Sequence, residues 1–495
     1  MTKPEEPYHK HVDFLEAGLA PYAKRSFEAA KPAFVDGAII HDTYEAIWRT
    51  TQGQLKLRHR TPLQVERDRI LYSSGLRKQT DKYHVLYNGQ RRIVRNYTTH
   101  SMRMAHVTRS ICRALRLNAD FAEAIALGSK IGAVPFIHAA KKPVSDWVIK
   151  KIKDIDRDYE KSAPLRRAPS ETIQADLFAQ SKETDLPRWI SDLKSSTVLD
   201  KVKTYIPWAI GRNVDAAYTA GQESYWLLCT NPFTREARQA AFSPDTMFGI
   251  WRHTRGLSTN PESFHHRAPL EGATAGFLEI RWDHITYESL VVQYADDITW
   301  IIENLSDAND AALLNRRGSL YDELTKVLGE SIPDGLLRPL SARDSGGIYT
   351  YFIEDFVRQS INILEDLNDG AIDRAALNTG DRKAIIGLSD EAKNQLDKIE
   401  KFLRIRVFTE PRVKNRTMML STISQACLDL LYTGVDDVLP RIISERAALE
   451  GWLTERADSA LILLRDDVHR VQLAVDIFAN MADQEIYDFV GIQSL

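Results

Sequence analysis

The spacing of apolar residues is the feature of this sequence that most constrains its fold, and the segment 286–308 shows it most clearly. Apolar side chains at three- and four-residue intervals are typical of an amphipathic α-helix packed in a core, and in this segment they are Leu290, Tyr294, Ile298, Ile301 and Leu305. Asp296 is offset from the stripe, next to Val292 and Trp300. A carboxylate in such a setting needs a cationic partner. The segment therefore predicts a buried helix with one charge to neutralise.

A second amphipathic helix is expected at 101–117, with His100 at its head. Thr98 or Thr99 is the natural N-cap, because a hydroxyl at that position accepts a hydrogen bond from the first free amides. Asn118 is expected to cap the helix that follows. This spacing places His100 at a buried edge, where a histidine is more often structural than a ligand.

Composition indicates a water-soluble globular protein. The chain has 495 residues, of which 43% are apolar and 27% charged, and no stretch approaches the roughly 20 apolar residues that cross a bilayer. The first residues form no signal peptide, so we expect a cytoplasmic location without membrane contact. Cys112, Cys229 and Cys427 are far apart, and we expect buried thiols that form neither a disulfide framework nor a zinc site.

The segment 56–117 is strongly basic. It holds fifteen Lys or Arg residues against Glu66, Asp68 and Asp81, a balance of +12. Such a block can form a nucleic-acid surface or a cradle for polyphosphate. Because many of its arginines lie in apolar, periodic sequence, we favour a folded pocket, with a solvated basic face as the alternative.

Four stretches of sequence carry a more specific signal. They are QVERDRILYSSGLRKQTDKYHVLY at 64–87, RNYTTHSMRMA at 95–105, EAIALGSKIGAVPFIHAAKK at 123–142 and TYESLVVQYADDITWIIENLSDA at 286–308. Together they resemble the HD-domain deoxynucleoside triphosphate triphosphohydrolases, the family of bacterial dGTPases. That family has a pattern close to EAIALAHDLGHPPFGHAGE at the third stretch. Weaker landmarks extend the resemblance to about residue 489.

The resemblance implies a divalent-metal site held by a His, a His-Asp pair and a distant Asp. The first ligand is kept as His100 and the last as Asp296, whereas Ser129 and Lys130 replace the pair. An ammonium group is no metal ligand and repels a cation. We therefore expect no cofactor, with Mg or Mn bound only if the residual site retains affinity. Lys130 is expected to pair with Asp296 and to contact phosphate; the alternative is a decayed loop without function.

Further site residues follow from the same resemblance. Family members place basic residues around the nucleotide phosphates, which assigns Arg77, Lys78, Lys82 and Arg95 to that role beside Lys130. His138 and Asp297 are the candidates for acid-base catalysis. Gln79 and Thr80 stand near the place of base recognition. The adjacent His265 and His266 are weak candidates for metal ligands, because they lack the spacing of a helical ligand pair.

The implied fold is all-α, an HD-domain helical core with additional helical segments. We expect an N-terminal helical extension at 1–60, a degenerate HD core at 61–312 and a C-terminal helical region at 313–495. The first functional hypothesis is a pseudoenzyme that binds a deoxynucleotide or related nucleotide as a sensor or regulatory subunit, with antiphage defence as an analogy. One alternative is an active dNTP triphosphohydrolase that releases deoxynucleoside and triphosphate. Another is a scaffold or single-stranded nucleic-acid binder, in a homo-oligomer or a complex with a partner protein.

Overall fold

The computed structural model of the chain describes several separate ranges of residues. The described residues are 62–83, 86, 95–166, 224, 228, 242, 246–247, 249–250, 264–267, 277–280, 286–310, 320–329, 332–368, 371, 386–434 and 467–491. The N-terminal extension expected at 1–60 lies outside them, as does Cys229. Cys112 and Cys427 are buried free thiols, as expected.

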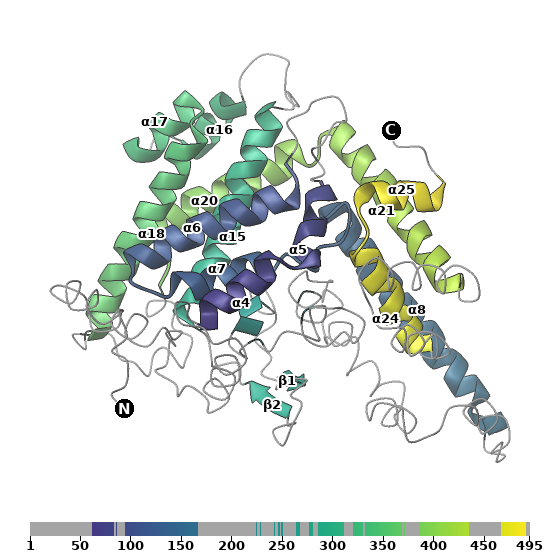
Figure 1. The fold of residues 1–495 in the computed structure, drawn as a ribbon. Helices are drawn as coiled ribbons and strands as arrows, with labels where there is room; N and C mark the ends of the chain where they lie inside the picture. The colour runs from purple at the N-terminus through teal and green to yellow at the C-terminus, as the bar shows by residue number, and fades with distance from the viewer. Residues whose placement is uncertain are drawn as a thin grey trace, which may run out of the picture.

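The all-α fold class is confirmed. Most described helices form one body, shown in Figure 1. Its elements are α4 (Pro62–Leu71), α5 (Ser74–Lys78), η1 (Gln79–Asp81), α6 (Tyr97–Ala114), α7 (Ala119–Gly128), α15 (Tyr287–Asp310), α16 (Leu320–Leu328), α17 (Asp334–Ala342), α18 (Ser345–Asn368), α20 (Asp390–Phe402) and η6 (Leu403–Val407). Helix α6 packs against α7, α15 and α18, while α7 also packs on α4. The chemistry-bearing helices α6, α7 and α15 therefore lie side by side.

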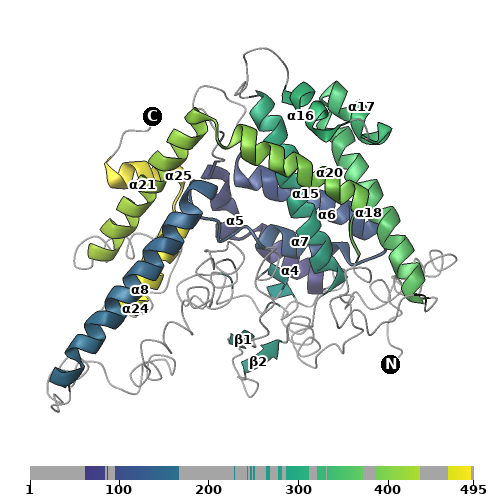
Figure 2. The same ribbon diagram turned by 180° about the vertical axis from the view of Figure 1, so that it is seen from behind.

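A second group of helices projects from one side of this body, as Figures 1 and 2 both show. It contains α8 (His138–Arg166), α21 (Pro411–Thr433), α24 (Asp467–Ala479) and α25 (Asp483–Val490). Helix α8 packs on α21 and α24, and α25 packs on α21. The one short antiparallel pair in the described chain joins β1 (Phe264–Arg267) to β2 (Phe277–Ile280), with Phe264 opposite Ile280.

The predicted stripe of α15 faces the core. Its residues Leu290, Ile298, Ile301 and Leu305 are buried. Tyr294 is the exception because it is only partly buried, with its ring 5.0 Å from that of Phe356 between centroids. Helix α15 thus has its apolar side in the body, and Asp296 lies at the edge of that side.

The start of α6 differs from the sequence prediction. Neither Thr98 nor Thr99 is the N-cap, because the helix begins at Tyr97 and the Asn96 side chain accepts from Thr99 N at 2.9 Å. His100 consequently lies inside the first turn and is 1% exposed. Asn118 does cap α7, accepting from Phe121 N at 3.0 Å, as predicted.

The loop between α7 and α8 has an unusual backbone. Phe136 and Ile137 have φ angles of 56° and 50°, in the left-handed region that residues other than glycine seldom adopt. Asp483, the first residue of α25, accepts from Phe136 N and Tyr83 N, each at 2.9 Å. Because such a conformation persists only where its surroundings hold it, the C-terminal helix stabilises the loop that leads into His138.

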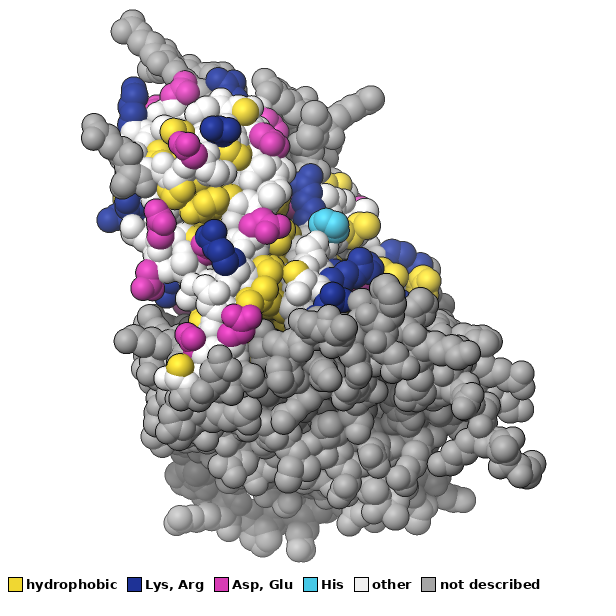
Figure 3. Space-filling model, turned by 90° about the vertical axis from the view of Figure 1, so that its left-hand side faces the viewer, with side chains coloured by type: hydrophobic (Ala, Val, Ile, Leu, Met, Phe, Trp, Pro, Cys, Tyr) yellow, Lys and Arg dark blue, Asp and Glu magenta, His cyan; other side chains and the backbone are white. Residues whose placement is uncertain are grey.

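In the described part of the chain, every helix is too short or too polar to cross a membrane. Figure 3 shows the face of the molecule over α17 and α18, where acidic and basic side chains are intermixed with apolar ones.

Candidate ion-pair site

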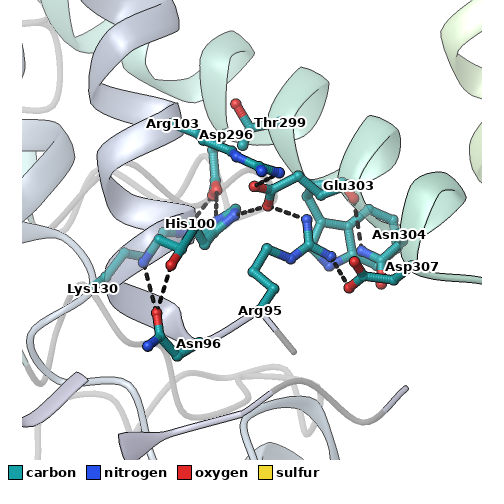
Figure 4. A network of polar contacts seen from close by, with 12 residues as sticks. Arg95, Asn96, His100, Arg103, Lys130, Asp296, Thr299, Glu303, Asn304 and Asp307 are labelled. Atoms are coloured by element: carbon teal, nitrogen blue, oxygen red, sulfur yellow. Dashed lines mark hydrogen bonds and ion pairs between the residues drawn. The ribbon is translucent and has the colours of Figure 1, made fainter. Parts of the chain in front are cut away.

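Glu303 of α15 is the centre of a buried ion-pair network, drawn in Figure 4. Its carboxylate is fully buried and has three cationic neighbours. His100 Nδ1 lies 2.6 Å from Oε2, and the Arg95 guanidinium pairs with the same oxygen. Arg103 Nη1 lies 3.3 Å from Oε1. Glu303 therefore joins α6 and the segment before it to α15.

Asp296 extends the network toward the end of α7. It precedes Glu303 by seven residues, two helical turns, so the two carboxylates share a side of α15. His100 Nε2 lies 3.3 Å from Asp296 Oδ1, and Lys130 Nζ donates to Asp296 Oδ2 at 2.7 Å. The pairing of Lys130 with Asp296 expected from the sequence is present. Lys130 itself is buried, with 6% of its surface exposed.

Arg95 was expected to contact phosphate, but its charge is used within the protein. The guanidinium pairs with Glu303 and with Asp307 one turn further along α15. Its side chain is only 4% exposed. Arg95 therefore joins the loop before α6 to α15, and a ligand would have to displace a carboxylate to reach it.

Opposing charges determine the protonation of the network. Burial by itself would lower the pKa of His100, but Glu303 and Asp296 raise it above its usual range. Burial would likewise raise the pKa of Glu303, whereas His100, Arg95 and Arg103 hold it below its usual value. Both ring nitrogens of His100 thus lie against carboxylates, which favour the protonated form of the imidazole.

These residues do not fit a divalent metal. A metal ligand must have a free nitrogen or oxygen lone pair, but both ring nitrogens of His100 contact carboxylates and Asp296 is paired with the ammonium group of Lys130. Ser129 offers little in place of the lost ligand, because its buried hydroxyl donates to Ala126 O at 2.9 Å. Within the described residues, no three His, Cys, Asp or Glu side chains are grouped so as to hold a metal ion.

His138, the first residue of α8, borders the network through Trp300 of α15. Trp300 Nε1 donates to His138 Nε2 at 2.8 Å, which leaves the ring hydrogen on Nδ1 when the ring is neutral. Desolvation by the surrounding protein, together with Lys141, Lys130 and His100, lowers the pKa of His138 to about 3. His138 is nevertheless an exposed residue. At neutral pH it is therefore an uncharged hydrogen-bonding group in a positive environment.

The remaining predicted site residues are placed apart from the network. Arg77 is exposed and Lys78 half-buried on α5. Lys82 is fully buried, and its ammonium donates to the carbonyls of Ala133 and Ala479, each at 2.5 Å. In this conformation Lys82 ties the loop before α8 to α24, away from any solvent-borne phosphate.

Asp297 is half-buried and points about 100° around α15 from Asp296. His265 and His266 lie in β1, of which the structure describes the backbone.

Sequence reasoning missed Glu303 and Asp307, although a signal for them existed. Asp296, Glu303 and Asp307 fall at i, i+7 and i+11, which is one side of a helix. Three carboxylates along one side of a half-apolar helix require several cations, and the basic block supplies Arg95 and His100. The family pattern drew attention to lost ligands and away from this stripe.

Other arginines of the basic block are also paired internally. Arg67 lies 2.8 Å from Asp68 and pairs with Asp120, and Arg109 Nη1 lies 3.3 Å from Glu123. These two arginines are thus neutralised within the protein, while a phosphate-binding pocket formed by the basic block stays a prediction. Their ion pairs bring α4 and α6 onto α7.

The fold and site define a class, an all-helical protein in which α6, α7 and α15 meet at a buried network of ion pairs. Comparison with known proteins finds relatives that match part of this chain. The chain is 40% identical over 136 residues to a deoxyguanosinetriphosphate triphosphohydrolase-like protein of Ralstonia pickettii (strain 12J), covering 27% of this chain and 29% of that protein. It is 43% identical over 84 residues to one of Azoarcus sp. (strain BH72), covering 17% and 22%.

A protein of the same name from Syntrophus aciditrophicus (strain SB) is 35% identical over 138 residues, which is 27% of this chain and 30% of that protein. The chain thus aligns with less than a third of the length of each of these relatives. No protein-family model matches it. Over the matched segments, the chain is similar to proteins named deoxyguanosinetriphosphate triphosphohydrolase-like, in agreement with the resemblance of its motifs.

Proposed function

We propose that this protein binds a deoxynucleotide, or a related nucleotide, without a divalent metal and acts as a sensor or regulatory subunit. The observation that carries the proposal is the 2.7 Å contact between Lys130 Nζ and Asp296 Oδ2. An ammonium group here gives the site a fixed positive charge suited to phosphate. It also excludes a divalent cation from the same carboxylate.

The ionisation of the site favours binding over hydrolysis. Hydrolysis of a phosphate ester at neutral pH needs an activated water, which a divalent metal supplies by lowering the pKa of that water. A monovalent ammonium group does so far less effectively. His138 has a pKa lowered to about 3, so it is a weak base and carries no proton to give as a general acid. The lack of a metal-activated water and the low pKa of His138 both reduce the expected rate of hydrolysis.

The second candidate function is an active dNTP triphosphohydrolase, and the family relationship favours it. Fixed cations can stabilise the charge that develops on phosphate oxygens. Asp296 or Asp297 would then have to act as the base. Asp296 is committed to His100 and Lys130, so activity through it would require the network to open.

Binding is best tested by thermal denaturation of the purified chain with each dNTP, in EDTA. We expect at least one dNTP to raise the denaturation temperature, and added manganese to leave that rise unchanged. Stabilisation that appears only with manganese would contradict metal-independent binding. No stabilisation under either condition would leave the scaffold function as the better account.

Hydrolysis is tested separately by release of inorganic triphosphate, with and without manganese, beside an active dGTPase. We expect no turnover above background. Turnover that disappears in Asp296→Ala would show that the protein is a hydrolase with an altered site. The Asp296→Ala control matters because a contaminating dGTPase would be unaffected by it.

A further inference from the structure

Lys141 is a half-buried lysine for which the sequence offered no role. It lies on α8 three residues after His138, on the same side of the helix. In the described part of the chain, no carboxylate lies within ion-pair distance of its ammonium group. The neighbouring Lys142 differs, because it is 81% exposed and pairs with Asp146 at 2.8 Å. Among the described residues, Lys142 thus has a carboxylate partner and Lys141 has none.

The position of Lys141 on α8 directs it toward the site. It is half-buried and lies one turn after His138, whose Nε2 accepts from Trp300 Nε1 of α15 at 2.8 Å. In agreement with this placement, burial lowers the pKa of Lys141, repulsion from Lys130 lowers it further, and attraction to Asp296 opposes both. Asp296 already pairs with Lys130 at 2.7 Å, so Lys141 adds a positive charge to the site.

The backbone at the start of α8 is not available for an anion. The amides of Ala139 and Ala140 donate to Phe136 O at 3.0 Å and to Ile137 O at 3.3 Å. The amide of Lys141 also donates to Ile137 O, at 3.1 Å. Helix N-termini usually bind anions through such amides. An anion here must be bound by side chains, so a single side-chain substitution should remove its binding.

The family pattern gives the same residues an opposite charge. The pattern EAIALAHDLGHPPFGHAGE has Asp where this chain has Lys130, and it ends in Glu where this chain has Lys141. At these two positions the family pattern carries two negative charges, whereas this chain carries two positive charges. Carboxylates suit a metal cation, whereas two converging ammonium groups suit an anion. The two substitutions therefore act in the same direction.

We propose that Lys141 and Lys130 together form an anion site that binds a phosphate group of the nucleotide, with Lys141 as the cation that the ligand neutralises. The inference rests on the proposed function, because it takes the ligand to be a nucleotide. Lys141 gains a counterion on binding, while Lys130 shares its charge between Asp296 and the phosphate. The free protein is strained electrostatically at Lys141, and the bound protein is relieved.

This arrangement predicts opposite effects of Lys141→Met on stability and on binding. Met has a side chain of similar length to that of lysine but carries no charge. The free variant should denature at a higher temperature than the wild type, because a half-buried, unpaired ammonium beside Lys130 is removed. Its affinity for the nucleotide should fall about tenfold to a hundredfold, the loss typical of one hydrogen bond to a charged group.

The experiment compares four proteins, which are the wild type, Lys141→Met, Lys141→Arg and Lys142→Met. Each is studied in EDTA by thermal denaturation and by titration with two ligands, a stabilising dNTP and inorganic triphosphate. Arg should retain binding, and Lys142→Met should retain binding without gaining the stability expected of Lys141→Met. A free Lys141→Met that is less stable than the wild type, or that binds both ligands as the wild type does, would overturn the inference. A wild type that binds no nucleotide would instead refute the proposed function.

Discussion

Substitution of Glu303 by Gln is the sharpest test of the buried network. Gln has nearly the same shape, so the change removes a charge and leaves the packing. Arg95 and His100 then each lose one of two carboxylate partners, and both are almost fully buried. Breaking a buried ion pair from one side typically costs about 3–5 kcal/mol. Arg103 adds little to this figure, because its side chain is 54% exposed and exposed pairs contribute about 0–1 kcal/mol.

The measurement is chemical denaturation at pH 7, followed by circular dichroism, with the slope of the transition compared between variants. Glu400→Gln is the matched control, since Glu400 forms a surface pair with Arg404 at 2.6 Å, one helical turn apart. We expect a loss of about 3–5 kcal/mol for Glu303→Gln and below about 1 kcal/mol for the control. Equal losses would refute the view that the network contributes more to stability than a surface ion pair.

Three further variants test the site and the segments around it. Lys82→Met should destabilise the fold, because two buried carbonyls lose their donor, while nucleotide affinity measured on the folded variant stays unchanged; lost affinity would restore the phosphate role. Burial raises the pKa of Asp483 to about 7 from its usual 3.8, so the folded state binds this proton more tightly and the wild type should lose stability as pH rises from about 4 to 7; Asp483→Asn should lack that decline in a denaturation series. Lys130→Asp with Ser129→His should raise manganese affinity, measured by calorimetry, and unchanged affinity would place the old metal site elsewhere.

Local features of the fold could be predicted from the sequence. The apolar stripe of α15 follows from helical periodicity, and the cap at Asn118 follows from the chemistry of its side chain. The prediction of the N-cap of α6 was wrong for a related reason. Asn96, Thr98 and Thr99 all lie near the start of that helix, and each residue type can cap a helix. The choice of Asn96 depends on where the chain enters the helix, which spacing alone does not determine.

The partners of the buried charges could not be predicted in the same way. Arg95 and Glu303 are more than two hundred residues apart, and the basic block offers many cations for each carboxylate. Family resemblance assigned Arg95 and Lys82 to phosphate, because basic residues near a nucleotide site usually serve that role. The structure instead pairs Arg95 with carboxylates and buries Lys82 against carbonyls. A sequence pattern shows which residue type occupies each position. Which charged side chains pair with one another depends on how the helices pack.

The carboxylates of this site are balanced by cations of the protein itself. His100 contacts Glu303 through Nδ1 and Asp296 through Nε2. Asp296 is also paired with Lys130, and Glu303 with Arg95. A divalent cation would therefore have to displace Lys130 from Asp296, whereas the proposed phosphate would approach Lys130 and Lys141 without any change in α6 or α15.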